Sequence, residues 1–197
     1  MAEEVYRQLS ETMGRRGGRY PGMDIPEFYD LAQELFTPEE AAIVNAMPRG
    51  FNPASTIAAE MGKSEEDMGA ALETMADKGL CTAGKMGETY VYALPPFVPG
   101  IFEFQFMRGT STERDKMLAR LIHAYKSAYD SIQGPPKVTF PGTRVITVDR
   151  KVEAGNTVHT YDQVASYVEK YDPLAVSTCF CRHQANLIDD KDNCGKP

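Results

Sequence analysis

Residues 37–79 read TPEEAAIVNAMPRGFNPASTIAAEMGKSEEDMGAALETMADKG, and this stretch decides the fold. Thr37 and Glu40 stand on either side of a proline in the pattern of a reciprocal capping box, which opens a helix. Gly62 predicts the end of a second helix, and Ser64 predicts the cap of a third. The three helices are expected over residues 38–47, 54–61 and 64–78.

Two short strands are expected next. Residues 80–85 and 89–94 read as strands joined by a turn at residues 86–88. Helix, helix, helix and hairpin is the order of elements in a winged helix. Over roughly residues 35–95 the chain therefore resembles the winged helix-turn-helix domain of many bacterial regulators. In DNA-binding members of that class the third helix enters the major groove.

The third helix is acidic here, which argues against a DNA partner. Neutralising backbone phosphates supplies most non-specific affinity for DNA, so an acidic helix would be repelled before any base could be read. We therefore expect a structural or protein-docking module rather than a DNA reader. The helix and its flanks carry Glu65, Glu66, Asp67, Glu73 and Asp77 against Lys63 and Lys78.

Composition narrows the class of protein further. The chain has 197 residues, 42% of them hydrophobic, and its 21 basic and 28 acidic residues leave a net charge of −7. Such a chain is expected to fold, and an acidic balance argues against broad attraction to nucleic acid or anionic lipid. With no run of about 20 uncharged apolar residues and no signal-peptide pattern, we expect a cytoplasmic protein with no membrane partner.

The remainder of the chain predicts an α+β protein with a long helix and a small α/β unit. Residues 101–107 fit either a strand or an aromatic helical turn, and residues 112–132 show a wide apolar face at helical spacing. That face is expected to pack on the winged helix or across the axis of a homodimer. The α/β unit comprises a strand at 144–149, a helix from 160 to 170 and a strand at 174–178. The segments are divided as 1–34, 35–96, 97–134 and 135–197.

Three of the four cysteines fall near the end of the chain. Cys179 and Cys181 follow the last predicted strand, and Cys194 comes later. In an extended chain residues two apart face the same side, so both thiols could address one metal while Phe180 turns into the core. Arg182 is the candidate charge-compensating residue at the site, because a nearby cation favours the thiolate that binds metal.

The fourth ligand stays open. Zinc and iron–sulfur sites usually take four protein ligands, and the cluster supplies three cysteines. The fourth cysteine, Cys81, lies in the predicted hairpin and is expected to be buried and inert. Remaining candidates are His183, Asp189, Asp190 and Asp192.

From about residue 144 to the end, the chain resembles a family of iron–sulfur proteins of anaerobic bacteria. Members begin with a winged helix and end in a ferredoxin-type domain with 4Fe–4S clusters. Cys179, Cys181, Arg182, Cys194 and Pro197 match the Cys-x-Cys-Arg and Cys-x-x-Pro patterns of that family. The resemblance implies electron transfer to a redox partner protein, and it implies that the chain stops before the ferredoxin domain. This chain alone is then expected to hold either no metal or zinc.

Three functions are compatible with these features of the sequence. The first is an iron–sulfur electron-transfer accessory protein, acting within an oxidoreductase system, whose winged helix serves for docking. The second is a winged-helix transcriptional regulator with a cysteine metal or redox sensor, and the third is an interaction module with idle cysteines. Hydrolytic catalysis has no signature, because the histidines show no HExxH spacing and no Gly-x-Ser-x-Gly elbow is present.

Overall fold

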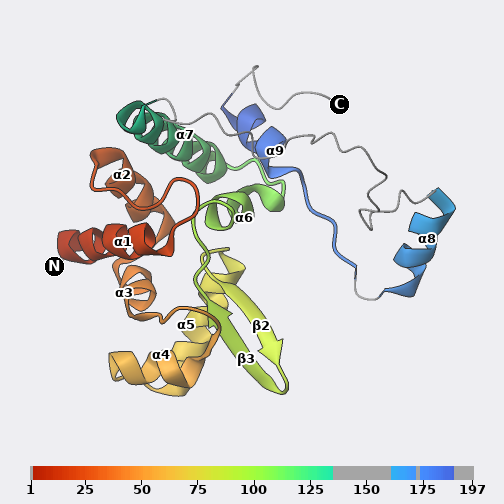
Figure 1. Cartoon of the computed structure of the whole chain (residues 1–197), viewed down its shortest axis with the longest axis horizontal. Helices are drawn as coiled ribbons and strands as arrows, with labels where there is room; N and C mark the ends of the chain where they lie inside the picture. Colours follow the sequence, from red (N-terminus) through yellow and green to blue (C-terminus); the bar gives the residue numbers. More distant parts are fainter. Residues whose placement is uncertain (1, 135–160, 172–173, 189–197) are drawn as a thin grey trace, which may run out of the picture. The chain divides into compact units, whose positions relative to one another are not determined.

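The computed structural model describes residues 2–134, 161–171 and 174–188. These residues form an α+β protein, made mostly of helices with one three-stranded antiparallel sheet (Figure 1). The predicted α+β class is therefore confirmed. Packing divides the chain into one unit of Met1–Gly134 with Ser177–Pro197 and a second of Pro135–Val176. Among the described residues, no helix is long and apolar enough to span a membrane.

Two helices open the first unit. Helix α1 spans Ala2–Arg16 and packs against α3, and helix α2 spans Pro26–Leu35 and packs against α7. The sequence reasoning missed α2, which has no side-chain cap at Ile25. Its signal was nevertheless present, because the buried residues of α2 recur at helical spacing. They are Phe28, Leu31, Ala32 and Leu35.

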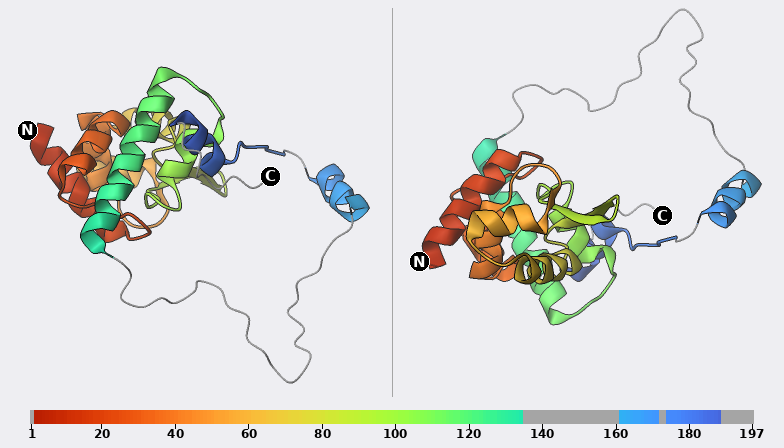
Figure 2. Two further views of the ribbon diagram at one scale, coloured as in Figure 1. Left: turned by 90° about the horizontal axis from the view of Figure 1, so that it is seen from above. Right: turned by 90° about the horizontal axis from the view of Figure 1, so that it is seen from below.

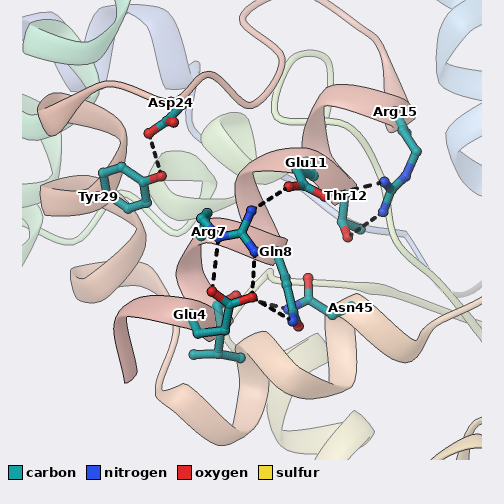
Figure 3. Close-up of polar contacts among 10 residues, drawn as sticks. Glu4, Arg7, Gln8, Glu11, Thr12, Arg15, Asp24, Tyr29 and Asn45 are labelled. Carbon is teal, nitrogen blue, oxygen red and sulfur yellow. Dashed lines mark hydrogen bonds and ion pairs between the residues drawn. The ribbon is translucent and has the colours of Figure 1, made fainter. Parts of the chain in front are cut away.

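The ion pairs on α1 are drawn in Figure 3, and they lie on the surface. Helix α1 is therefore stabilised mainly by the burial of its hydrophobic residues. Arg7 pairs with Glu4 at 2.6 Å and with Glu11 at 3.0 Å, and all three side chains are at least half exposed. Exposed pairs of this kind contribute little because water screens them. A more specific contact joins α1 to α3, where the Asn45 side-chain amide donates to the carbonyl of Val5 at 3.0 Å.

The predicted helical stretch is confirmed. Helix α3 spans Pro38–Ala46, α4 spans Ala54–Met61 and α5 spans Glu65–Asp77. The Thr37 and Glu40 side chains form the expected reciprocal capping box, and Ser64 accepts a hydrogen bond from the backbone of α5. Gly62 ends α4 with a left-handed backbone, at φ 62°, a conformation that glycine adopts without steric cost.

The hairpin is confirmed as well, and a third strand joins it. Strands β2 (Thr82–Met86) and β3 (Thr89–Ala93) pair antiparallel, with Lys85 opposite Tyr90. The short strand β1 (Asn52–Pro53) pairs with the other edge of β3, so the sheet order is β1-β3-β2. The hairpin lies beside α4 and α5 in Figure 1.

Two further helices complete the main body of the first unit. The aromatic segment forms helix α6 (Ile101–Met107), which decides between the two predicted structures. Helix α7 spans Glu113–Gln133, close to the expected bounds, and packs on α2, α6 and α9 (Figure 2). Contacts within the chain thus cover much of its apolar face, while the homodimer stays a prediction.

The last described segments agree with the prediction for the helix but not for the strand that follows it. Helix α8 (Tyr161–Lys170) confirms the predicted helix, and helix α9 spans Phe180–Leu187. The expected strand at 174–178 is wrong: these residues form no strand. Instead, the backbone N–H of Thr178 donates to the carbonyl of Met107 at the end of α6. The strand predicted at 144–149 lies outside the described residues, and the segment boundaries at 34, 96 and 134 stay predictions.

An aromatic cluster lies at the centre of the first unit. Phe97 stacks on Phe102 with ring centroids 4.8 Å apart, and the Phe28 ring meets that of Tyr125 edge-on at 5.8 Å. The Tyr125 hydroxyl also donates to the carbonyl of Pro21, and burial raises the pKa of this phenol above its usual value. The cluster therefore joins α2, α6, α7 and two loops through buried aromatic area.

Replacing Phe97 by alanine is expected to lower the free energy of unfolding by about 3–5 kcal/mol, because it empties a site with no solvent exposure. The matched control is Phe51→Ala, which removes the same atoms from a side chain that is 54% exposed, and its effect should stay below about 1 kcal/mol. Urea unfolding followed by circular dichroism measures both. Equal losses in the two variants would show that the aromatic cluster is not the stabilising centre.

Candidate functional site

The three described residues of the predicted metal site lie at the start of α9. Cys179 is the N-cap residue, Cys181 lies in the first helical turn, and Arg182 follows it. All three side chains are exposed. The positive end of a helix dipole favours negative charge, so this location suits thiolate ligands and an anionic cluster.

The predicted geometry of the two thiols is wrong. That prediction requires an extended chain, in which residues two apart share a face. Instead the helix begins at Phe180, between the two cysteines. Residues two apart in a helix do not face each other, so shared ligation would depend on the N-cap position of Cys179 rather than on strand alternation. The expectation that Phe180 turns inward is confirmed, since it packs against the core.

Helix α9 is held against α6 and α7, which places the two cysteines on a supported element. Ala185 and Leu187 are buried on its inner side. The segment before α9 approaches the turn after α6 so closely that a side chain on Gly109 would collide with the Thr178 side chain. Gly109 also has a φ of +73°, which is another reason for glycine at that position.

The His183 side chain contacts the backbone of the loop between α6 and α7. Its Nε2 lies 2.6 Å from the carbonyl oxygen of Thr110, and because a carbonyl only accepts, Nε2 carries the proton. This bond removes Nε2 as a metal ligand and leaves Nδ1. Nearby, Asp115 is partly buried, which raises its pKa, but hydrogen bonds from the Thr112 backbone and hydroxyl outweigh burial and lower it.

An apolar groove lies directly beside Cys179. It has a volume of about 530 Å³ and is formed where α6 faces the segment that leads into α9. Its lining includes Pro95, Pro99, Phe104, Met107, Cys179 and Phe180. Sequence reasoning missed this groove. The alternating phenylalanines of 102–106 were the available signal, but their helical placement could not be read from the spacing alone.

The complete ligand set stays a prediction. Cys194 and the three candidate aspartates lie outside the described residues. Within the described part of the chain, no group of three or more His, Cys, Asp or Glu side chains is placed to hold a metal. Two of the predicted ligands are therefore located, and their partners are not.

Cys81 confirms its expected burial. Only 3% of the residue is exposed, and its thiol donates to the carbonyl of Leu72 at 3.5 Å. Burial, together with the charge of Glu73, raises the pKa of Cys81 to about 12. A thiol in this state is protonated at neutral pH and is a poor nucleophile and metal ligand.

Comparisons with protein-family models, with curated proteins and with solved structures find no match to this chain.

Alkylation of the native protein is expected to separate the cysteines by location. At pH 8, iodoacetamide should modify Cys179 and Cys181, which are exposed, while Cys81 should react only after unfolding. Peptide mass spectrometry measures the extent of modification at each site over time. Denatured protein provides the control, because all the cysteines should then react alike. Equal rates for Cys81 and Cys179 in the native state would contradict the buried placement of Cys81.

Proposed function

We propose that this chain is part of an iron–sulfur electron-transfer accessory protein. The observation that carries the proposal is the placement of Cys179 and Cys181 at the exposed N-terminus of α9, a helix anchored to α6 and α7. Thiolates are the protein ligands that iron–sulfur clusters prefer. Arg182 adds a positive charge next to the pair and is proposed as the charge-compensating residue.

The residues present fit part of such a site. Two thiols come from the described part of the chain, and Cys194 is proposed as a third ligand. Full 4Fe–4S ligation would then need a further ligand in the full-length protein. When bound, a cluster supplies one-electron transfer. Zinc is the alternative metal for a smaller thiolate site.

The surroundings of Cys179 are suited to adjusting a redox centre. The apolar lining of the groove beside it would lower the polarity next to a bound cluster, and the polarity of the surroundings is one of the factors that set reduction potential. The first backbone N–H groups of α9 have no acceptor within the helix, so they would be available as hydrogen-bond donors to a bound cluster. Both features belong to the described residues of this chain.

Residues 38–93 are proposed to form a winged helix that docks a partner. The order α3-β1-α4-α5-β2-β3 and the sheet order β1-β3-β2 support this assignment. Helix α5 presents its acidic residues to solvent, which opposes DNA binding and supports the choice of a protein partner. The partner is proposed to be a redox protein of the cytoplasm.

Anaerobic purification of the full-length protein, with any residues that follow Pro197, tests the proposal. Iron and acid-labile sulfide are expected in the wild type, and Cys179→Ser and Cys181→Ser should each lower both. The matched control is Cys81→Ala, which removes a buried thiol and should keep the metal content. Iron, sulfide and zinc are measured together by elemental and chemical analysis.

Each result bears on one part of the proposal. A full-length protein without iron and sulfide would contradict the iron–sulfur function, and zinc in their place would assign a structural or sensing site. Unchanged iron in both serine variants would show that the ligands lie elsewhere. Loss of iron in the Cys81 variant alone would reverse the assignment of ligand and buried thiol.

A further inference from the structure

A groove runs between helix α5 and strand β3, on the face of the hairpin that carries Tyr90 and Tyr92. We call it the α5–β3 groove. Its volume is about 560 Å³. The residues that line it are Pro53, Ala54, Glu65, Glu66, Gly69, Ala70, Glu73, Thr89, Tyr90 and Tyr92.

The charged residues that line the groove are acidic. Glu65, Glu66 and Glu73 contribute three carboxylates, and none of the lining residues is basic. In the part of the chain that the structure describes, neither Glu65 nor Glu66 takes part in an ion pair. The hairpin carries one lysine, Lys85, and its Nζ is paired with Glu88 at 3.4 Å. A positively charged group is therefore the complement that this groove lacks.

Two tyrosines, Tyr90 and Tyr92, line the groove together with the three glutamates. The Tyr92 hydroxyl donates to Glu73 Oε1, which holds that carboxylate against the wall of the groove. Tyr90 is 57% exposed, and Lys85 Nζ lies 5.9 Å from its ring centroid. An exposed aromatic ring next to carboxylates suits a guanidinium or ammonium group, which binds both the ring face and the negative charge.

The glycine at position 69 affects the shape of the groove, independently of its charge. It lies in the interior of α5, where glycine is less stable than alanine. Packing does not require it, because a side chain added there would meet only the Ala54 methyl group, at an ordinary 3.9 Å. Its backbone is helical, so no positive φ requires it either. What Gly69 does provide is a low floor in the groove.

We propose that the α5–β3 groove docks a positively charged segment of a partner protein, with an arginine or lysine side chain held between Glu66, Glu73 and Tyr90. The inference rests on the docking role proposed above and gives the partner its chemistry. Duplex DNA is the wrong complement, since its phosphates would meet three uncompensated carboxylates. Specificity would come from the Tyr90 ring and from the low floor at Gly69, and the opposite charges of groove and partner would speed their association.

A short peptide of alternating glycine and arginine serves as the probe, with the glycine–glutamate peptide as its control. Titration followed by amide NMR shifts should place the arginine peptide at Gly69, Ala70 and Tyr90. Glu66→Gln and Glu73→Gln should each weaken binding about two- to five-fold, the range expected of a single exposed ion pair. Glutamine can still accept the Tyr92 hydrogen bond, so the wall of the groove is kept.

The matched control variant is Glu60→Gln. Glu60 is an exposed carboxylate of α4 outside the groove, so its substitution changes the net charge equally. It should leave peptide affinity within measurement error at moderate salt, because distant exposed charges are screened. An equal loss in the Glu60 and Glu66 variants would reduce the binding to general electrostatics and overturn the proposal.

Gly69→Leu separates binding from folding. Leucine is a better helix former than glycine, so the melting temperature should stay at or above that of the wild type. The leucine side chain would occupy the floor of the groove, and peptide affinity should fall at least ten-fold. Unchanged peptide affinity in this variant would overturn the proposed position of the bound segment.

The remaining outcomes distinguish this inference from the iron–sulfur proposal. Peptide shifts elsewhere, stronger binding of the glutamate peptide, or binding of duplex DNA at this groove would each overturn the inference. None of these variants touches a cysteine, so iron and sulfide content should be unchanged in all of them. A full-length protein without iron that still binds arginine peptide at the groove would contradict only the iron–sulfur proposal.

Discussion

The buried contact of Tyr125 with its aromatic neighbours is the constraint on which the first unit depends. Phe28, Phe97 and Phe102 approach this ring from α2, from the linker after the hairpin and from α6. Helices α6 and α7, which carry Phe102 and Tyr125 of this cluster, form the platform against which α9 packs. The location of Cys179 and Cys181 follows from the packing of α9 on this platform and from the hydrogen bonds of Thr178 and His183 to the end of α6 and the loop after it.

The same platform connects the two proposed surfaces. At the C-terminal end of α5, Arg108 donates to the carbonyl of Asp77 at 2.6 Å, and the Gln105 side chain donates to that of Lys78 at 3.1 Å. Both side chains belong to α6 or the residue that follows it, and α6 also contacts α9. The proposed docking groove and the proposed cysteine site therefore share one structural support.

Local rules account for the parts of the fold that sequence reasoning predicted. The caps at Thr37 and Ser64 and the left-handed Gly62 depend on side chains only a few residues away, so their patterns identify them directly. Burial of Cys81 followed from its place in a hairpin next to an amphipathic helix. Helix α2 was not predicted because it lacks a capping side chain, although its buried residues have helical spacing. The strand predicted at 174–178 was wrong for a different reason: strand propensity depends on packing against neighbouring strands, and within the described part of the chain no strand pairs with this segment.

The sequence by itself determined the α3–α5 helices, the hairpin, the acidic character of α5 and the presence of closely spaced thiols. Those properties reside in residue identity and in spacing over a single turn or strand. Only the tertiary structure decided that Cys179 caps a helix and Cys181 lies within it, because the docking of α9 on α6 and α7 selects that conformation. It also decided that three carboxylates, two tyrosines and Gly69 line one groove, since residues about 20 positions apart meet there only when β3 folds back beside α5.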